Sequence, residues 1–113
     1  MIKCNKKMKI IDYLNKYYPI YEDLNVHICE GCDCIEAPNG TKAFGVFIPQ
    51  EKQIYVAEDI PEKEYGLPHT IAHEFRHYMQ YMLSKPFDED DADIFADTIM
   101  NILESSQEEA WND

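Results

Sequence analysis

Two histidines four residues apart carry the most specific chemistry in this sequence. They are His73 and His77, within the pentapeptide HEFRH. Residues i and i+4 lie one turn apart on the same face of an α-helix, so both imidazoles can bind one metal ion. This spacing is typical of zinc sites in which the adjacent glutamate, here Glu74, serves as general base toward water. The three residues therefore predict metal-assisted hydrolysis.

The segment 68–84, PHTIAHEFRHYMQYMLS, is predicted to be one helix. Pro68 suits a first helical turn, no glycine or proline follows within the segment, and Pro86 ends it. At about 100° per residue the apolar side chains gather on one face. That face holds Ile71, Phe75, Tyr78, Met79 and Met82, and the opposite stripe holds Thr70, His73, His77, Gln80 and Ser84. An ordinary surface helix with two exposed histidines would carry Lys and Glu on that stripe, so we favour a metal-binding helix.

A catalytic zinc site needs three protein ligands and one position left to water. The acidic stretch after Pro86 predicts a second helix, from about Asp88 to Glu104. In projection, Asp91 falls within its apolar stripe, and a carboxylate there is costly without a cation. We therefore predict Asp91 as the third ligand, the alternative being a capping or solvated acidic run, with Asp88 as the cap. The stripe consists of Ala92, Ile94, Phe95, Ile99, Ile102 and Leu103, whereas Asp90, Asp93 and Asp97 are expected to face away.

The segments HEFRHYMQ and DDADIFAD together resemble the ImmA/IrrE family of small zinc metallopeptidases. In that family the HExxH helix precedes a helix with an E-x-A-N/D-x-F-A-like signature, and the acid before the alanine is the third ligand. The resemblance implies that Asp91, which precedes Ala92, takes this role in a minimal zincin-like domain. The family residue is usually Glu, and Asp is shorter by one methylene. The Leu-Leu-Met-Pro-like continuation typical of the family is missing here.

Upstream segments predict the elements that hold the active helix. Residues Lys6 to Tyr18 read as an amphipathic helix that ends at Pro19. Residues 25–29 form a short strand, and Ala43 to Ile48 pairs with Gln53 to Ala57 as an antiparallel hairpin. The fold class is thus α+β, with an N-terminal helix, a small antiparallel sheet, the HExxH helix and a C-terminal helix with the third ligand. By resemblance to zincins, the hairpin around Gln53 to Ala57 would bind the substrate backbone.

Composition limits the function classes. A chain of 113 residues with 45% hydrophobic residues is sufficient for one modest core, so we expect a single domain over residues 1–113. The net charge of −12 disfavours nucleic acids and anionic membranes as partners. No apolar run approaches the roughly 20 residues that span a bilayer, and the N-terminus has no cleavage-site pattern. These features predict a cytoplasmic protein.

The four cysteines allow a second metal site. Cys29, Cys32 and Cys34 lie within CEGCDC, and Cys4 or His27 would complete a tetrahedral zinc site. The irregular spacing favours reduced cysteines in a turn instead. His69, one turn before His73, is expected to cap the helix or to contact a ligand. Oxyanion stabilisation is left open among Arg76, Tyr65, Tyr78 and Tyr81.

The residues favour a zinc-dependent peptidase that acts on a peptide or protein substrate. Zn²⁺ would be held by His73, His77 and Asp91, with Glu74 as general base. One alternative is a zincin-derived binding or regulatory protein with structural zinc and no peptidase activity. Another is an interaction module organised by zinc at the cysteines of CEGCDC, which would bind two metal ions per chain.

Overall fold

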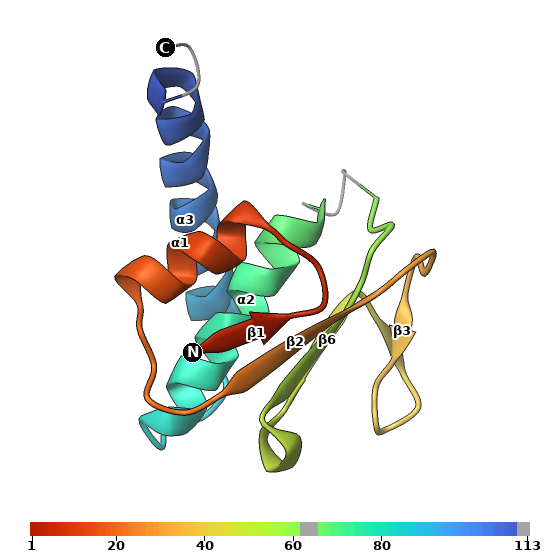
Figure 1. Ribbon diagram of the computed structural model, residues 1–113. Coiled ribbons are helices and arrows are strands. Elements are labelled where there is room, and N and C mark those ends of the chain that lie inside the picture. Colours follow the sequence, from red (N-terminus) through yellow and green to blue (C-terminus); the bar gives the residue numbers. More distant parts are fainter. Residues whose placement is uncertain (62–65, 111–113) are drawn as a thin grey trace.

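Helices cover one side of a small sheet in this α+β chain (Figure 1). The computed structural model describes residues 1–61 and 66–110. Within these ranges the sheet strands are β1 (Ile2–Cys4), β2 (Leu24–Cys29), β5 (Gly45–Ile48) and β6 (Gln53–Ala57), in the order β1-β2-β6-β5. A separate hairpin of β3 (Ile35–Glu36) and β4 (Lys42–Ala43) lies on the other side of the sheet. The helices are α1 (Lys9–Tyr17), α2 (Gly66–Met82) and α3 (Glu89–Ala110).

The sheet is mixed, so the prediction of an antiparallel sheet is wrong. The β5–β6 hairpin is confirmed, with Ile48 opposite Gln53. A 3-10 turn (Pro49–Glu51) joins its strands, and Lys52 closes it in the left-handed region at φ 51°. In contrast, β2 runs parallel to both β6 and β1. The three-residue strand β1 was not predicted, because its pairing partner is distant in sequence and its own residues show no clear alternation.

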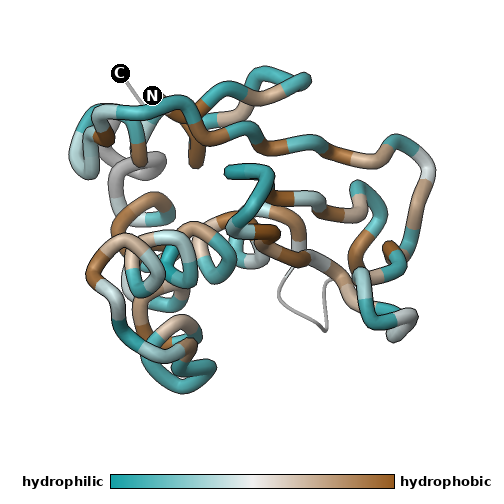
Figure 2. Tube along the Cα trace, turned by 90° about the horizontal axis from the view of Figure 1, so that it is seen from below, coloured by the Kyte–Doolittle hydropathy of each residue, from teal (hydrophilic) through white to brown (hydrophobic). Residues whose placement is uncertain are grey.

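The core lies between the sheet and the helices. In β2 every second residue from Leu24 to Ile28 is buried, which is the period expected of a strand with one covered face. Hydrophobic and hydrophilic residues alternate over the same stretch of the chain (Figure 2). Helix α1 contributes to the same core from its apolar stripe. The buried side chains are Leu24, Val26 and Ile28 of β2, Ile54 and Val56 of β6, and Ile10, Ile11 and Leu14 of α1.

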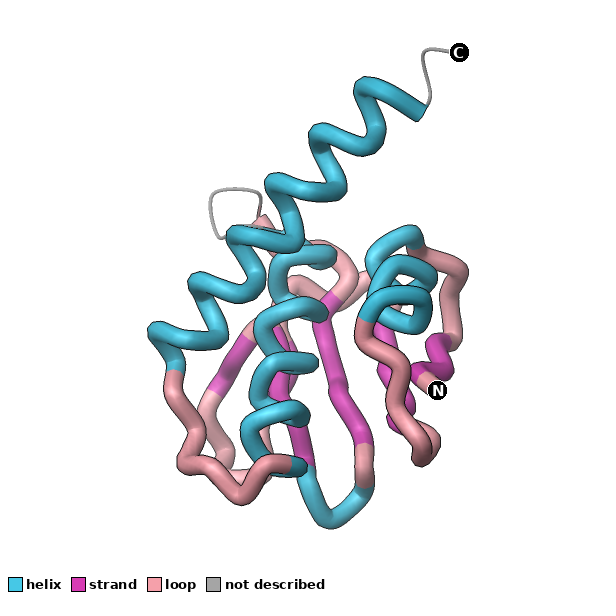
Figure 3. The backbone as a smooth tube through the Cα atoms, turned by 90° about the vertical axis from the view of Figure 1, so that its left-hand side faces the viewer, coloured by secondary structure: helices cyan, strands magenta, loops and turns pink. Residues whose placement is uncertain are grey.

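Helices α2 and α3 pack side by side in opposite directions, and the C-terminal half of α3 extends beyond α2 (Figure 3). Among the described side chains of α3, the buried ones are Ala92, Ala96 and Ile99. Phe95 contacts α2 as well, with its ring centroid 6.4 Å from that of Phe75. Ile94, expected in the buried stripe, is 66% exposed, because it lies on the side of α3 away from α2. Small alanines allow close approach of the two helices, which brings polar side chains at their margins into contact. Among the described residues, none of the helices combines the length and apolar character needed to cross a membrane.

Candidate metal centre

Helix α2 brings the predicted metal-binding histidines together. The Nε2 atoms of His73 and His77 lie 3.1 Å apart, as expected for imidazoles one helical turn from each other. Glu74 lies beside them, with its Oε2 3.9 Å from His73 Nε2. Among the described residues, these three side chains form a group close enough together to hold a metal ion.

Glu89, in the first turn of α3, approaches both imidazoles. Its Oε2 is 2.8 Å from His73 Nε2, and its Oε1 is 3.0 Å from His77 Nε2. Glu74 Oε2, at 3.9 Å, lies farther from His73 Nε2 than Glu89 Oε2 does. Sequence reasoning missed Glu89 because it looked like one more acid at a helix N-terminus.

Asp91 lies elsewhere, so the expected ligand set is not the one that the fold assembles. Arg76 donates from Nε to Asp91 Oδ2 at 2.8 Å and from Nη2 to Oδ1 at 3.2 Å. Gln80 donates from Nε2 to Asp91 Oδ2 at 2.9 Å. The hydrogen bonds and charge of Arg76, with the bond from Gln80, lower the pKa of Asp91 to about 2. The Asp91 carboxylate is paired with a cation, as its place in the apolar stripe required. That cation is the guanidinium of Arg76 on α2 and not a metal ion.

Two acids that were expected to face away contact histidines instead. Asp93 Oδ1 lies 2.8 Å from His73 Nδ1, and Asp97 Oδ1 lies 2.8 Å from His69 Nε2. The two helices run in opposite directions, so residues spaced by four on α2 lie opposite residues spaced by four on α3. The opposed pairs are His69 with Asp97, His73 with Asp93, and His77 with Glu89. His69, which was expected to cap the helix or to contact a ligand, contacts Asp97.

The burial of Glu74 suits a proton acceptor at neutral pH. Its side chain sits between α2 and β5, and the residue is 8% exposed. Loss of hydration raises its pKa to about 7, while His77 and a hydrogen bond from the backbone of Phe47 act in the opposite direction. Gly45 permits this close packing, because a Cβ there would lie 2.7 Å from Thr70 Cγ2 and 3.2 Å from Glu74 Cγ.

An open cleft of about 540 Å³ runs along the histidines. Strand β5 forms one wall, and His69, Glu89, Asp93 and Phe87 contribute to the lining. The strand beside the active helix at the sheet edge is therefore β5, whereas β6, expected to bind substrate, is paired on both sides.

The three candidates for oxyanion stabilisation that the structure describes do not line this cleft. Tyr78 is buried and donates to Glu22, and Arg76 is paired with Asp91. Tyr81 lies near Lys52, whose Nζ is 4.7 Å from its ring centroid. The fourth candidate, Tyr65, lies outside the described residues.

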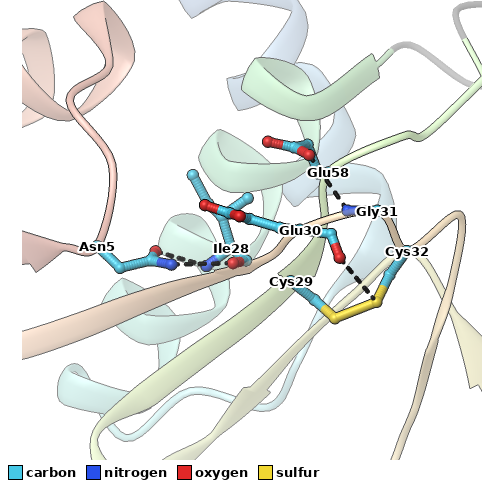
Figure 4. The surroundings of a disulfide bond; sticks show 7 residues. All are labelled: Asn5, Ile28, Cys29, Glu30, Gly31, Cys32 and Glu58. Carbon is cyan, nitrogen blue, oxygen red and sulfur yellow. Dashed lines mark hydrogen bonds between the residues drawn. A yellow bond between two sulfur atoms is a disulfide. The ribbon is translucent and has the colours of Figure 1, made fainter.

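The cysteines form no metal site among the residues that the structure describes. Cys29 and Cys32 are joined by a disulfide at the end of β2, in contrast to the expected reduced thiols (Figure 4). The turn is held by Glu58, whose Oε1 accepts the backbone N–H of Gly31 at 3.2 Å. Cys4 and Cys34 are free thiols.

Comparison of the chain with family models, with curated proteins and with solved structures gives no match. The geometry of the site is therefore the evidence for the function of the chain.

Proposed function

We propose that this chain is a zinc-dependent peptidase whose metal ligands are His73, His77 and Glu89. The observation that carries the proposal is the convergence of Glu89 on the Nε2 atoms of both histidines, beside the buried Glu74 and an open cleft. Two imidazoles and one carboxylate are a ligand set that suits catalytic zinc. Glu89 replaces Asp91 in this assignment, and with that change the resemblance to the ImmA/IrrE family remains part of the proposal.

The donor atoms fit a bound cation. Without one, two imidazole nitrogens 3.1 Å apart and a carboxylate would face one another and have to share protons. Zn²⁺ lowers the pKa of a coordinated water and polarises a carbonyl group. Glu74, whose pKa is raised by burial in the metal-free chain, would take the proton from that water and deliver it to the leaving amine. Asp93 holds the ring of His73 through Nδ1, which keeps Nε2 directed at the cation.

The edge strand β5 is the surface on which a peptide substrate would bind. Its far side is unpaired in the sheet, so its backbone groups can bond an extended peptide. Phe47 and Phe87, with ring centroids 6.3 Å apart, supply an apolar wall of the cleft beside His77. We therefore propose substrates with an apolar side chain next to the scissile bond. An open cleft at the metal centre favours hydrolysis over a purely structural zinc ion.

Zinc titration of single variants tests the ligand set. We expect one zinc per chain in the parent protein and loss of binding in His73→Ala and His77→Ala. Glu89→Gln should weaken zinc binding by at least about 100-fold, more than the loss of an outer hydrogen bond does. The control is Asp90→Asn, which removes the same charge from the exposed neighbouring residue. Equal affinity in Glu89→Gln and Asp90→Asn would refute the assignment of Glu89.

A peptide-library assay tests the reaction. The parent protein with zinc should cleave peptides, and Glu74→Gln should bind zinc but not cleave. Stoichiometric zinc without any cleavage would favour the binding or regulatory protein with structural zinc.

A further inference from the structure

We infer that Gln80 is a positioning residue that holds the hydrogen of His77 on Nδ1, and that Asp91 and Arg76 hold Gln80 in turn. This inference deepens the proposed function and rests on it, since His77 is a proposed ligand through Nε2. Asp91, which the helical projection predicted as a ligand, thereby acts on the metal centre indirectly. It bonds Gln80, and Gln80 bonds His77.

The orientation of the Gln80 amide follows from its backbone partners. Its Oε1 accepts the N–H of Asp88 at 3.1 Å, and its Nε2 donates to the carbonyl oxygen of the same residue at 3.1 Å. A flipped amide would set its NH₂ against the N–H of Asp88 and its oxygen against the carbonyl. Backbone groups have fixed donor and acceptor roles, so the orientation is determined without reference to the histidine.

That orientation determines the tautomer of His77. Oε1 of Gln80, which can only accept, lies 2.8 Å from His77 Nδ1. Nδ1 must therefore carry the hydrogen, and in the neutral ring Nε2 then has the free lone pair. Nε2 is the atom that faces His73 and Glu89. His77 is thus prepared to bind a metal ion through the correct nitrogen before the ion arrives.

Asp91 and Arg76 restrict the position of Gln80. Asp91 Oδ2 accepts from Gln80 Nε2, and the two donors of Arg76 fix the plane of the carboxylate. Gln80 itself is 4% exposed, so water does not compete effectively for its hydrogen bonds. His73 needs no such relay, because Asp93 contacts its Nδ1 directly.

The first test measures zinc affinity by competition with a chelator. Gln80→Met keeps the size of the side chain but removes its hydrogen bonds, and should weaken zinc binding by about 10–100-fold. Asp91→Asn changes the partner of Gln80 and of Arg76, and should weaken zinc binding by a smaller factor, because Asp91 acts on His77 only through Gln80. The control for loss of the Asp91 charge is Asp90→Asn, which should match the parent protein. Zinc affinity of Gln80→Met equal to that of the parent protein would overturn the inference.

The second test needs no metal and separates the two proposals. A two-bond ¹H–¹⁵N correlation spectrum of the zinc-free protein, at a pH where histidines are neutral, identifies the tautomer of each ring. We expect Nδ1–H for His77 in the parent protein and a mixture or the Nε2–H form in Gln80→Met. Unchanged Nδ1–H in Gln80→Met would overturn the inference even if zinc binds. Failure of the parent protein to bind zinc would refute the proposed function, while the spectrum would still decide the role of Gln80.

Discussion

Glu74 acquires its chemical character from burial at the contact of α2 with β5. The HEFRH spacing predicts the role of Glu74 as general base, but its raised pKa comes from loss of hydration in the folded chain. Glu89 likewise depends on its surroundings, because the fold places its carboxylate opposite two imidazoles. At this scale the residue type supplies the functional group, and the surroundings determine what it does.

Glu74→Gln should separate metal binding from catalysis. The amide is nearly the same size and cannot accept a proton from water, so peptidase activity should fall by about 10²–10⁴-fold. Zinc affinity should stay close to that of the parent protein, because Glu74 is not a proposed ligand. Both quantities are measured on the same preparation, by zinc titration and by kcat/KM for a cleaved peptide. Full activity in the variant would exclude Glu74 as the general base.

The elements meet through contacts that leave little free space. The approach of β5 to α2 depends on the absence of a side chain at Gly45, and that of α3 to α2 depends on Ala92 and Ala96. These contacts place the edge strand, the glutamate and the histidines around one cleft. Small residues at helix and strand contacts therefore contribute to the geometry of the candidate site as well as to packing.

Gly45→Ala should disturb both stability and the site. The added Cβ would lie 2.7 Å from Thr70 Cγ2, so α2 and β5 must separate or side chains must shift. We expect a loss of about 1–3 kcal/mol in the free energy of unfolding, measured with urea. Adding Thr70→Ser removes the nearest methyl group but keeps the hydroxyl that donates to the carbonyl oxygen of Gly66. The double variant should regain part of the stability, and no regain would show that the strain arises elsewhere.

Asp91→Asn should reduce the loss in free energy of unfolding that occurs when the pH is lowered. The folded pKa of Asp91, about 2, lies below its ordinary value of 3.8. The pairing therefore stabilises the zinc-free fold above about pH 4, and this contribution is lost as the pH falls toward 2. The side chain is 39% exposed, so we expect a contribution of roughly 1 kcal/mol or less. Urea unfolding at pH 7 and pH 3 should differ less in Asp91→Asn than in the parent protein, whereas Asp90→Asn should retain the parent's difference.

At the scale of the whole molecule, a metal at the α2–α3 contact would tie the last helix to the rest of the fold. Both histidines lie on α2 and Glu89 lies on α3, so an ion that binds all three bridges the two elements. Around this centre the acidic chain, with its net charge of −12, also gains a local compensating charge. Metal binding and global stability should therefore be coupled.

Zinc should raise the melting temperature of the parent protein. At a free zinc concentration 100 times the Kd, binding adds about 2.7 kcal/mol to the stability of the folded state. For a chain of this length such a gain corresponds to a shift in Tm of roughly 10 °C. Calorimetry with and without zinc measures it, and the double variant His73→Ala/His77→Ala should show no shift. A shift that persists in the double variant would place the metal at other residues.

The sequence alone was enough to predict the helix that carries His73, Glu74 and His77, the β5–β6 hairpin and the α+β class. These features depend on interactions within a few residues, whose periodicity is visible in the chain. The partners of that helix required the tertiary structure. On α3 the stripe of Ala92, Ala96 and Ile99 is flanked by Glu89 on one side and by Asp91 on the other. Both flanks are acidic, and only the position of α2 and β5 relative to that stripe decides which acid meets the histidines and which one pairs with Arg76.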